Sequence, residues 1–369
     1  MKLQLDPNKT YAIALEGGGA RGAYEIGVWK ALREAGIRFN AVSGTSVGAL
    51  NGALYALGDL EKATACWENI SLNQVLRLTE EEEQRLSSLL QGKLDFSWVK
   101  SVQDVQAALN QAGDILKNGG LDIGPLREWI AQVVDPHALK NSPVQLYVTT
   151  VNLTNRRTEE IHIQEVPEED ICNMLMASAY HPTFRQEKLS GKNYADGGFF
   201  DTIPLNVLVE NGYKDIIAVR LPSIGIERPF KKPDDVNVIM FKTRVPLGQV
   251  LNFTSEQARF DLQVGYLDAM RMLYGLAGDK YYIDLTLSEE EAMAALARRS
   301  LFKGRSRSLP RYMEMELPAR VLLLGTTEKS YRAYLLCLLE NAAKEKKIDP
   351  FRVYTDLELF TILQKEEKK

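Results

Sequence analysis

The chain has 369 residues, of which 45% are hydrophobic, and a formal net charge of −4 from 45 basic and 49 acidic side chains. This length allows a large hydrophobic core in one large or two ordinary domains, and the balanced charge argues against nucleic acid as a partner. Three widely spaced cysteines are expected to be reduced thiols of a cytoplasmic protein. Residues 1–10 lack an apolar signal region, and no stretch approaches the ~18–20 apolar residues of a membrane span, so we expect at most peripheral membrane contact.

Residues 10–58 alternate between strand and helix patterns. Residues 10–15 (TYAIAL) form a short apolar strand that runs into three glycines, and residues 22–35 carry an apolar face at helical spacing. A second strand over 39–42 precedes a helix over 46–57 that contains no charged residue, which is typical of a buried helix. This order predicts a parallel sheet with short crossovers.

Residues 60–120 break this alternation. Residues 79–82 (TEEE) match a capping box that opens an amphipathic helix extending to Leu90. No glycine motif or catalytic candidate falls in this segment. We therefore expect a helical insertion over one edge of the sheet.

From residue 121 the sheet pattern resumes. We expect helices over 168–179, 204–212 and 248–275, and strands over 144–150, 158–163, 193–196, 215–221 and 236–242. The last part of the chain, residues 288–369, is helical in pattern and highly charged. The predicted fold class is α/β, with a mainly parallel sheet flanked by helices, a helical insertion and a helical C-terminal region.

Three glycine-bearing segments each follow a predicted strand: residues 17–22 (GGGARG), 44–48 (GTSVG) and 196–198 (DGG). The second segment, between a strand and a helix, has the pattern of a nucleophile elbow, whose glycines allow the sharp turn that exposes the Ser46 oxygen. The helix that starts at Ser46 points its positive N-terminal end at this oxygen, which favours an oxyanion there.

The glycine segment of residues 17–22 has two functional interpretations. Its G-x-G-x-x-G spacing matches a dinucleotide-binding fingerprint, but that fold requires an acid about 20 residues further on, and residues 40–43 (NAVS) contain none. Alternatively, the backbone N–H groups of Gly18, Gly19 and their neighbours form an oxyanion hole beside Ser46. The third alternative is a tight turn without a ligand.

The base that activates Ser46 is restricted by the histidines, which occur only at positions 137, 162 and 181. None follows Asp196, so the serine–acid–histidine order of α/β-hydrolases cannot be built with Asp196. His181 is an alternative base, although a histidine before a proline at a helix end is more typical of a cap or a pocket wall. Asp196 ends a strand, and in a partly dry site its pKa can rise enough to accept the serine proton.

The three segments, in this order, resemble those of the patatin-like phospholipase family over roughly residues 10–224, and residues 177–182 (ASAYHP) resemble a further family segment. The resemblance implies a three-layer α/β/α domain over residues 1–287, with an extension over 288–369 of unassigned role. Two departures stand out: Glu16 occupies a position where Asp is frequent, and Thr202 one where Asn is common, which would loosen the loop supporting Asp196.

The resemblance also implies a role for each motif residue. Ser46 is the nucleophile and Asp196 the base, without a histidine. The implied oxyanion hole consists of Gly17, Gly18, Gly19, Arg21 and Gly22. Gly44 and Gly48 belong to the nucleophile elbow, and Gly197 and Gly198 to the loop that supports Asp196.

The sequence therefore predicts a serine acyl hydrolase that acts on lipid or other acyl esters and needs neither a metal nor a cofactor. One alternative is a catalytically silent relative that binds lipid or a partner protein through the same cleft, and a weaker one is a nucleotide-binding protein. The insertion at 60–120 is expected to dock on the core. Alternatively, it forms a mobile flap whose apolar face meets acyl chains or a bilayer.

Overall fold

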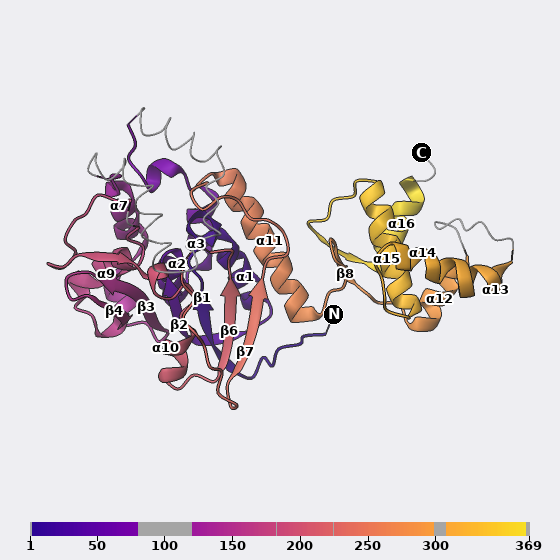
Figure 1. Ribbon diagram of the computed structural model, residues 1–369, viewed down its shortest axis with the longest axis horizontal. Helices are drawn as coiled ribbons and strands as arrows, with labels where there is room; N and C mark the ends of the chain where they lie inside the picture. The colour runs from indigo at the N-terminus through magenta and orange to yellow at the C-terminus, as the bar shows by residue number, and fades with distance from the viewer. Residues whose placement is uncertain (1, 80–119, 182, 224, 299–307, 367–369) are drawn as a thin grey trace. The chain divides into compact units, whose positions relative to one another are not determined.

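The chain divides into two compact units in the computed structural model. The N-terminal unit is Leu5–Ala269, and the C-terminal unit is Met270–Lys369 together with Met1–Gln4. The domain boundary expected from the sequence, at residue 287, concerns the extent of the family domain and stays a prediction. The structure describes residues 2–79, 120–181, 183–223, 225–298 and 308–366 (Figure 1).

In the described part of the chain, the N-terminal unit contains a seven-stranded sheet with the order β4-β3-β2-β1-β6-β7, and β5 pairs with β3. Neighbours from β3 through β2, β1 and β6 to β7 are parallel, whereas β4 and β5 are antiparallel to β3. Its strands are β1 (Thr10–Leu15), β2 (Arg38–Thr45), β3 (Gln145–Asn152), β4 (Arg157–His162), β5 (Tyr194–Asp196), β6 (Asp215–Arg220) and β7 (Asn237–Lys242).

Helices cover both faces of this sheet (Figure 1). On one face, the apolar side of α10 packs in a cluster with Ala12, Ala14 and Ile216 of the central strands. On the other face, α2 lies against Val42 and Leu146. The prediction of a mainly parallel sheet flanked by helices is confirmed. The helices are α1 (Ala23–Glu34), α2 (Val47–Leu57), α3 (Leu60–Glu68), α7 (Gly124–Val133), α8 (Pro136–Lys140), α9 (Ile171–Ser178), α10 (Leu205–Glu210) and α11 (Ser255–Tyr274).

The helix expected from residue 248 begins seven residues later, at Ser255. Pro246 and Gly248 disfavour a helix at the start of the predicted range, and the Thr254 hydroxyl accepts the Gln257 N–H at 3.4 Å at the observed start. The residues before it form a loop instead, and Val250 of this loop accepts the Ala20 N–H at 2.7 Å. The correction matters because this loop packs on the glycine segment.

The C-terminal unit has its own core, built from buried residues such as Leu296, Leu338, Leu339 and Leu359. It is mostly helical, as expected, but it also contains a pair of parallel three-residue strands that the sequence pattern was too short to reveal. Its elements are β8 (Tyr282–Asp284), α12 (Glu289–Ala297), α13 (Leu309–Arg311), a π-helical turn (Tyr312–Glu316), α14 (Leu317–Leu323), α15 (Tyr331–Glu345), β9 (Val353–Thr355) and α16 (Asp356–Glu366).

Most of the expected insertion at 60–120 lies outside the described residues. Its beginning contains α3 and a short 3-10 turn at Leu72–Gln74. The predicted helix from residue 79 to Leu90, and with it the choice between a docked segment and a flap, stays a prediction. Among the described helices, none combines the length and apolar character needed to cross a bilayer.

Candidate functional site

Ser46 and Asp196 lie close together because β2 and β5 both pair with the same edge of β3. One edge of β3 pairs with β4 from Tyr147 to Asn152, so β2 and β5 must both use the other edge. On that edge, β2 ends with Thr45 opposite Thr149, and β5 ends with Asp196 opposite the next residue, Thr150. Two residues that are 150 positions apart in the sequence therefore meet end to end.

The Ser46 side chain contacts the Asp196 carboxylate directly. Ser46 Oγ donates to Asp196 Oδ2 at 2.6 Å, and Oδ1 of the same carboxylate accepts the Gly198 N–H at 2.8 Å. Asp196 is only 8% exposed. Burial raises the pKa of Asp196 to about 6, although the hydrogen bonds from Ser46 and Gly198 oppose the shift. Near neutral pH this carboxylate is therefore ionised and basic enough to accept a proton from its neighbour.

The backbone at Ser46 adopts a conformation that is rare for a residue with a side chain, with φ 56° and ψ −124°. Strain of this kind persists only where the surrounding structure enforces it. The two flanking glycines are required by close approach, because a Cβ on Gly44 would lie 2.2 Å from Gly48 O and one on Gly48 2.6 Å from Leu15 O. The turn thus has the geometry of a nucleophile elbow between β2 and α2.

The glycine segment lies beside the elbow, since a Cβ on Gly17 would be 3.3 Å from Ser46 Cβ. The Gly17 N–H donates to Thr202 O at 2.9 Å, and the Ala20 N–H donates to the loop at Val250. In residues 2–79 and the other described ranges, the N–H groups of Gly18 and Gly19 have no hydrogen-bond partner. Both N–H groups can therefore bind an acceptor from outside the segment.

Arg21 and Gly22 have contacts of a different kind. Arg21 Nε donates to Gly248 O at 2.7 Å, and its guanidinium also donates to the Pro222 carbonyl, so the side chain fastens two loops to the glycine segment. Gly22 O accepts the Asn51 amide at 2.9 Å, which ties the end of the segment to α2.

The loop that follows Asp196 connects all of these parts through its backbone. Gly197 packs so closely on β3 that a Cβ would lie 2.1 Å from Thr149 O. The Asp201 N–H donates to Gly197 O at 2.9 Å, and Asp201 O accepts the Thr45 hydroxyl at 2.8 Å. Thr202 acts through its carbonyl on Gly17, as any residue could, so the sequence departure at this position leaves the connection intact.

No histidine in the described residues, which include all three, is hydrogen-bonded to Ser46 or Asp196. The His181 ring is exposed, lies 2.9 Å from the Thr183 hydroxyl and packs edge-on against Phe184. The other two histidines are paired with Glu168 and Gln145. The hydrogen bond and ring contact of His181 are therefore both to residues other than Ser46 and Asp196.

Sequence reasoning missed two buried polar residues that contact the site. Ser178 accepts the Ser46 N–H at 3.0 Å, and the family-like segment at 177–182 was the only sequence signal for it. Asp201 is 1% exposed, and burial raises the pKa of its carboxyl to about 7 against the opposing hydrogen bonds of two N–H groups. No sequence signal marks Asp201, because its neighbours come from distant parts of the chain.

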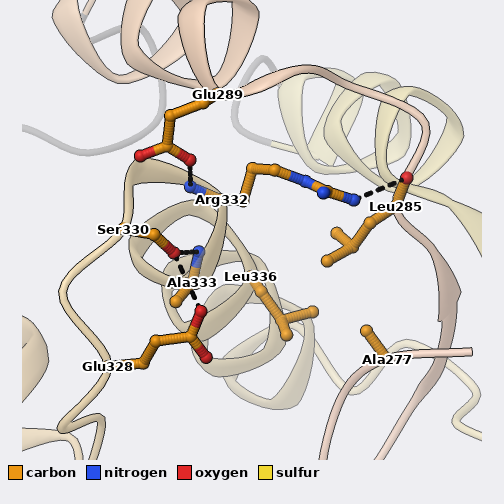
Figure 2. A pocket seen from close by; sticks show the side chains of 8 residues that line it. All are labelled: Ala277, Leu285, Glu289, Glu328, Ser330, Arg332, Ala333 and Leu336. Atoms are coloured by element: carbon orange, nitrogen blue, oxygen red, sulfur yellow. Dashed lines mark hydrogen bonds between the residues drawn. The ribbon is translucent and has the colours of Figure 1, made fainter.

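A cavity of about 460 Å³ lies in the C-terminal unit (Figure 2). Two of its polar side chains bind the first turn of α15: Glu289 of α12 accepts the Arg332 N–H at 3.1 Å, and Ser330 accepts the Ala333 N–H at 3.1 Å. Ser330 Oγ also donates to Glu328 Oε1 at 3.1 Å, but Glu328 is exposed, unlike the buried Asp196 carboxylate. In the described ranges, no group of three or more His, Cys, Asp or Glu side chains is placed to hold a metal ion.

Comparisons with known proteins agree with the motif analysis. Residues 13–209 match the family model described as patatin-like phospholipase. Patatin-like phospholipase domain-containing protein 6 of Homo sapiens is 26% identical over 214 residues, which are 58% of this chain and 13% of that protein. Lysophospholipase NTE1 of Saccharomyces cerevisiae is 23% identical over 263 residues, which are 71% of this chain and 14% of that protein.

Among solved structures, VipD from Legionella pneumophila is similar over 92% of this chain and 81% of that one, with a TM-score of 0.42 and 17% identity. The curated relatives are much longer proteins, since the aligned region spans only 13–14% of their length.

Proposed function

The chain belongs to the patatin-like phospholipase family, and from this premise we propose that it hydrolyses lipid esters with Ser46 as the nucleophile and Asp196 as its base. The observation that carries the proposal is the 2.6 Å hydrogen bond from Ser46 Oγ to a buried carboxylate. The strained elbow at Ser46 and the two unengaged N–H groups beside it provide the other parts that acyl transfer needs.

The first half of the proposed reaction forms an acyl-enzyme. Ser46 Oγ attacks the ester carbonyl carbon while its proton passes to Asp196 Oδ2. The N–H groups of Gly18 and Gly19, together with the N-terminal end of α2, stabilise the oxyanion of the tetrahedral intermediate. When the intermediate collapses, the ester C–O bond breaks, and the leaving alcohol takes the proton from Asp196.

The second half releases the acid. Asp196 accepts a proton from water, the water oxygen attacks the acyl carbon, and the same two N–H groups bind the second oxyanion. Collapse returns the proton to Ser46 Oγ and frees the carboxylic acid. Both halves use one carboxylate as base and then as acid, and the proposed steps need no metal or cofactor.

The substrate class follows from the family. The human relative is described as a patatin-like phospholipase domain-containing protein and the yeast relative as a lysophospholipase. We propose glycerolipid or lysolipid esters as substrates, reached by a cytoplasmic protein through peripheral contact with a membrane or micelle.

The test is a panel of phospholipids, lysophospholipids and neutral lipids in mixed micelles, with products identified by mass spectrometry. We expect fatty acid release by the wild type and none by Ser46→Ala. A fluorophosphonate probe should modify the wild type at Ser46. A wild type that neither releases fatty acid nor reacts with the probe would instead be a silent relative that only binds lipid or a partner.

A further inference from the structure

Ser46 directly follows the last residue of β2, and its backbone N–H donates to a side chain of α9. The N–H donates to Ser178 Oγ at 3.0 Å, and the same hydroxyl donates to Thr149 O at 2.7 Å. Thr149 is the residue of β3 that faces Thr45, the last residue of β2. One hydroxyl therefore extends the connection between the two strands past the point where their pairing stops.

The same helix end also holds the other half of the dyad. Ser178 is the last residue of α9, and two residues later Tyr180 O accepts the Asp196 N–H at 2.8 Å. The preceding carbonyl, of Ala177, accepts the Thr150 hydroxyl at 2.8 Å. The end of α9 and the two residues after it thus bind the backbone of both Ser46 and Asp196.

The hydroxyl matters because Ser46 is strained. A residue with φ 56° tends to relax towards an ordinary conformation unless its neighbours prevent it. Ser178 is fully buried, so no solvent water replaces its hydroxyl. Without that hydroxyl, both the Ser46 N–H and the Thr149 carbonyl lose a partner inside the protein, and backbone movement at Ser46 would recover other bonds for them.

We propose that Ser178 is a positioning residue for the reaction: its hydroxyl holds the elbow so that Ser46 Oγ stays within hydrogen-bond distance of Asp196 Oδ2. This inference rests on the proposed function. Ser178 acts through the backbone of Ser46 and takes no part in proton transfer. A small misplacement of a nucleophile is enough to slow acyl transfer strongly while leaving substrate binding almost unchanged.

The experiment compares Ser178→Ala with a matched control, Ser43→Ala. Ser43 is also a fully buried serine, lies three residues before Ser46 on β2, and donates to a backbone carbonyl, Pro204 O, at the same 2.7 Å. Each variant loses one buried hydroxyl, so we expect similar decreases in Tm. The turnover of each variant is normalised to the fraction of protein that a fluorophosphonate modifies at completion.

We expect Ser178→Ala to lower kcat per modified site by roughly 10- to 100-fold with KM within about twofold of the wild type. Ser43→Ala should change both by less than about twofold. Ser178→Cys retains a weaker hydrogen-bonding atom, so its kcat should lie between those of Ser178→Ala and the wild type, and it replaces the alanine variant if that one does not fold.

Two outcomes distinguish a failure of the proposed role of Ser178 from a failure of the proposed hydrolase function. If the wild type is modified and active but Ser178→Ala has the kcat of Ser43→Ala, the role of Ser178 is structural only and the inference is overturned. If the fluorophosphonate leaves the wild type unmodified and no lipid is hydrolysed, the proposed function fails, and the role of Ser178 fails with it.

Discussion

Particular carboxylates of the two units differ in the hydrogen-bond partners that they have. In the C-terminal unit, carboxylates bind backbone donors. Glu340 Oε1 alone accepts the N–H groups of Asp279, Lys280 and Tyr281 at 2.8–3.0 Å. Asp356 likewise holds the segment before α12 by accepting the Leu287 N–H at 2.9 Å and the Thr286 hydroxyl at 2.6 Å. Such bonds to backbone N–H groups stabilise the fold.

In the N-terminal unit, several carboxylates are buried with fewer donors than they can use. Glu25, Asp201 and Asp261 each have one buried oxygen without a hydrogen-bond partner. Burial raises the pKa of Asp196 and of Asp261 to about 6, and that of Asp201 to about 7. Burial thus raises the pKa of three aspartates of the N-terminal unit, including Asp196, whereas Glu340 and Asp356 of the C-terminal unit stabilise its fold by binding backbone N–H groups.

The largest expected difference is in activity. Asp196→Asn should lower kcat/KM by about 10²–10⁴-fold, because an amide keeps the shape but cannot accept the Ser46 proton. Glu340→Gln in the C-terminal unit should leave kcat of the folded protein unchanged. Steady-state hydrolysis of one lysophospholipid in micelles measures both, and a comparable loss in Glu340→Gln would contradict the division of roles.

Asp196→Asn and Glu340→Gln should also differ in stability, but here Glu340→Gln is expected to be the more damaged variant. The folded pKa of Asp196, about 6, lies above the ordinary aspartate pKa of 3.8, so ionisation at pH 8 opposes folding by roughly 3 kcal/mol at most. Asp196→Asn should therefore be at least as stable as the wild type at pH 8. Glu340→Gln, which weakens three bonds to backbone N–H groups, should unfold at lower urea concentration.

Activity should depend on pH through Asp196. Below pH 6 the carboxyl is protonated and cannot act as a base, so kcat/KM should fall by about tenfold per pH unit. Asp201 titrates nearby, at about 7, so Asp201→Asn is the control. We expect the acid limb near pH 6 in both proteins. Loss of this acid limb in Asp201→Asn would mean that the pH dependence of kcat/KM comes from Asp201 and not from Asp196.

Stability of the N-terminal unit should depend on pH as well. For Asp196, Asp201 and Asp261 the folded pKa is above the unfolded one, so protons bind more tightly to the folded state. The unfolding free energy is then highest below about pH 4, falls as pH rises from there to the folded pKa values of about 6 and 7, and levels off above them. Hydrogen exchange at pH 5.5 and pH 8, corrected for intrinsic rates, should show weaker protection of β1 and β2 at pH 8. Equal protection at the two pH values would mean that ionisation of these carboxyls does not destabilise the fold.

The smallest effect belongs to a helix cap in the C-terminal unit. At the start of α12, Ser288 Oγ accepts the Glu291 N–H at 3.2 Å, while the Glu291 carboxylate accepts the Ser288 N–H at 2.8 Å. Ser288→Ala should destabilise this unit by about 1 kcal/mol without changing kcat. Denaturant titration and turnover of the same sample measure both, and a decrease in kcat would connect this unit to catalysis.

Local patterns predicted the parts of the site that depend on neighbouring residues. The strand that ends at Leu15, the elbow at Ser46 and the buried helix after it are each encoded within a few positions, because glycine spacing and apolar periodicity act locally. The histidine count left His181 and an acid as the alternatives for the base, and the structure places the Asp196 carboxylate against Ser46.

Features that depend on contacts between distant parts of the chain could not be predicted from the sequence. Nothing near Asp196 reveals that β5 continues along the edge of β3 that β2 leaves, since a three-residue strand carries no register information. The hydroxyl of Ser178 and the burial of Asp201 become visible only when α9 and the loop after Asp196 are placed in space. The loop ending at Thr254 was mistaken for helix because it follows the sheet and precedes a long helical pattern.

We propose that Ser46 carries the acyl group and that Asp196 alone activates it. The most direct measurement is rapid quenching of the enzyme with a chromogenic acyl ester, followed by mass spectrometry of the peptides. We expect an acyl adduct on Ser46 in the wild type and in His181→Ala, formed at similar rates, and a rate at least about 100-fold lower in Asp196→Asn. An adduct on another residue, or undiminished acylation in Asp196→Asn with loss in His181→Ala, would contradict it.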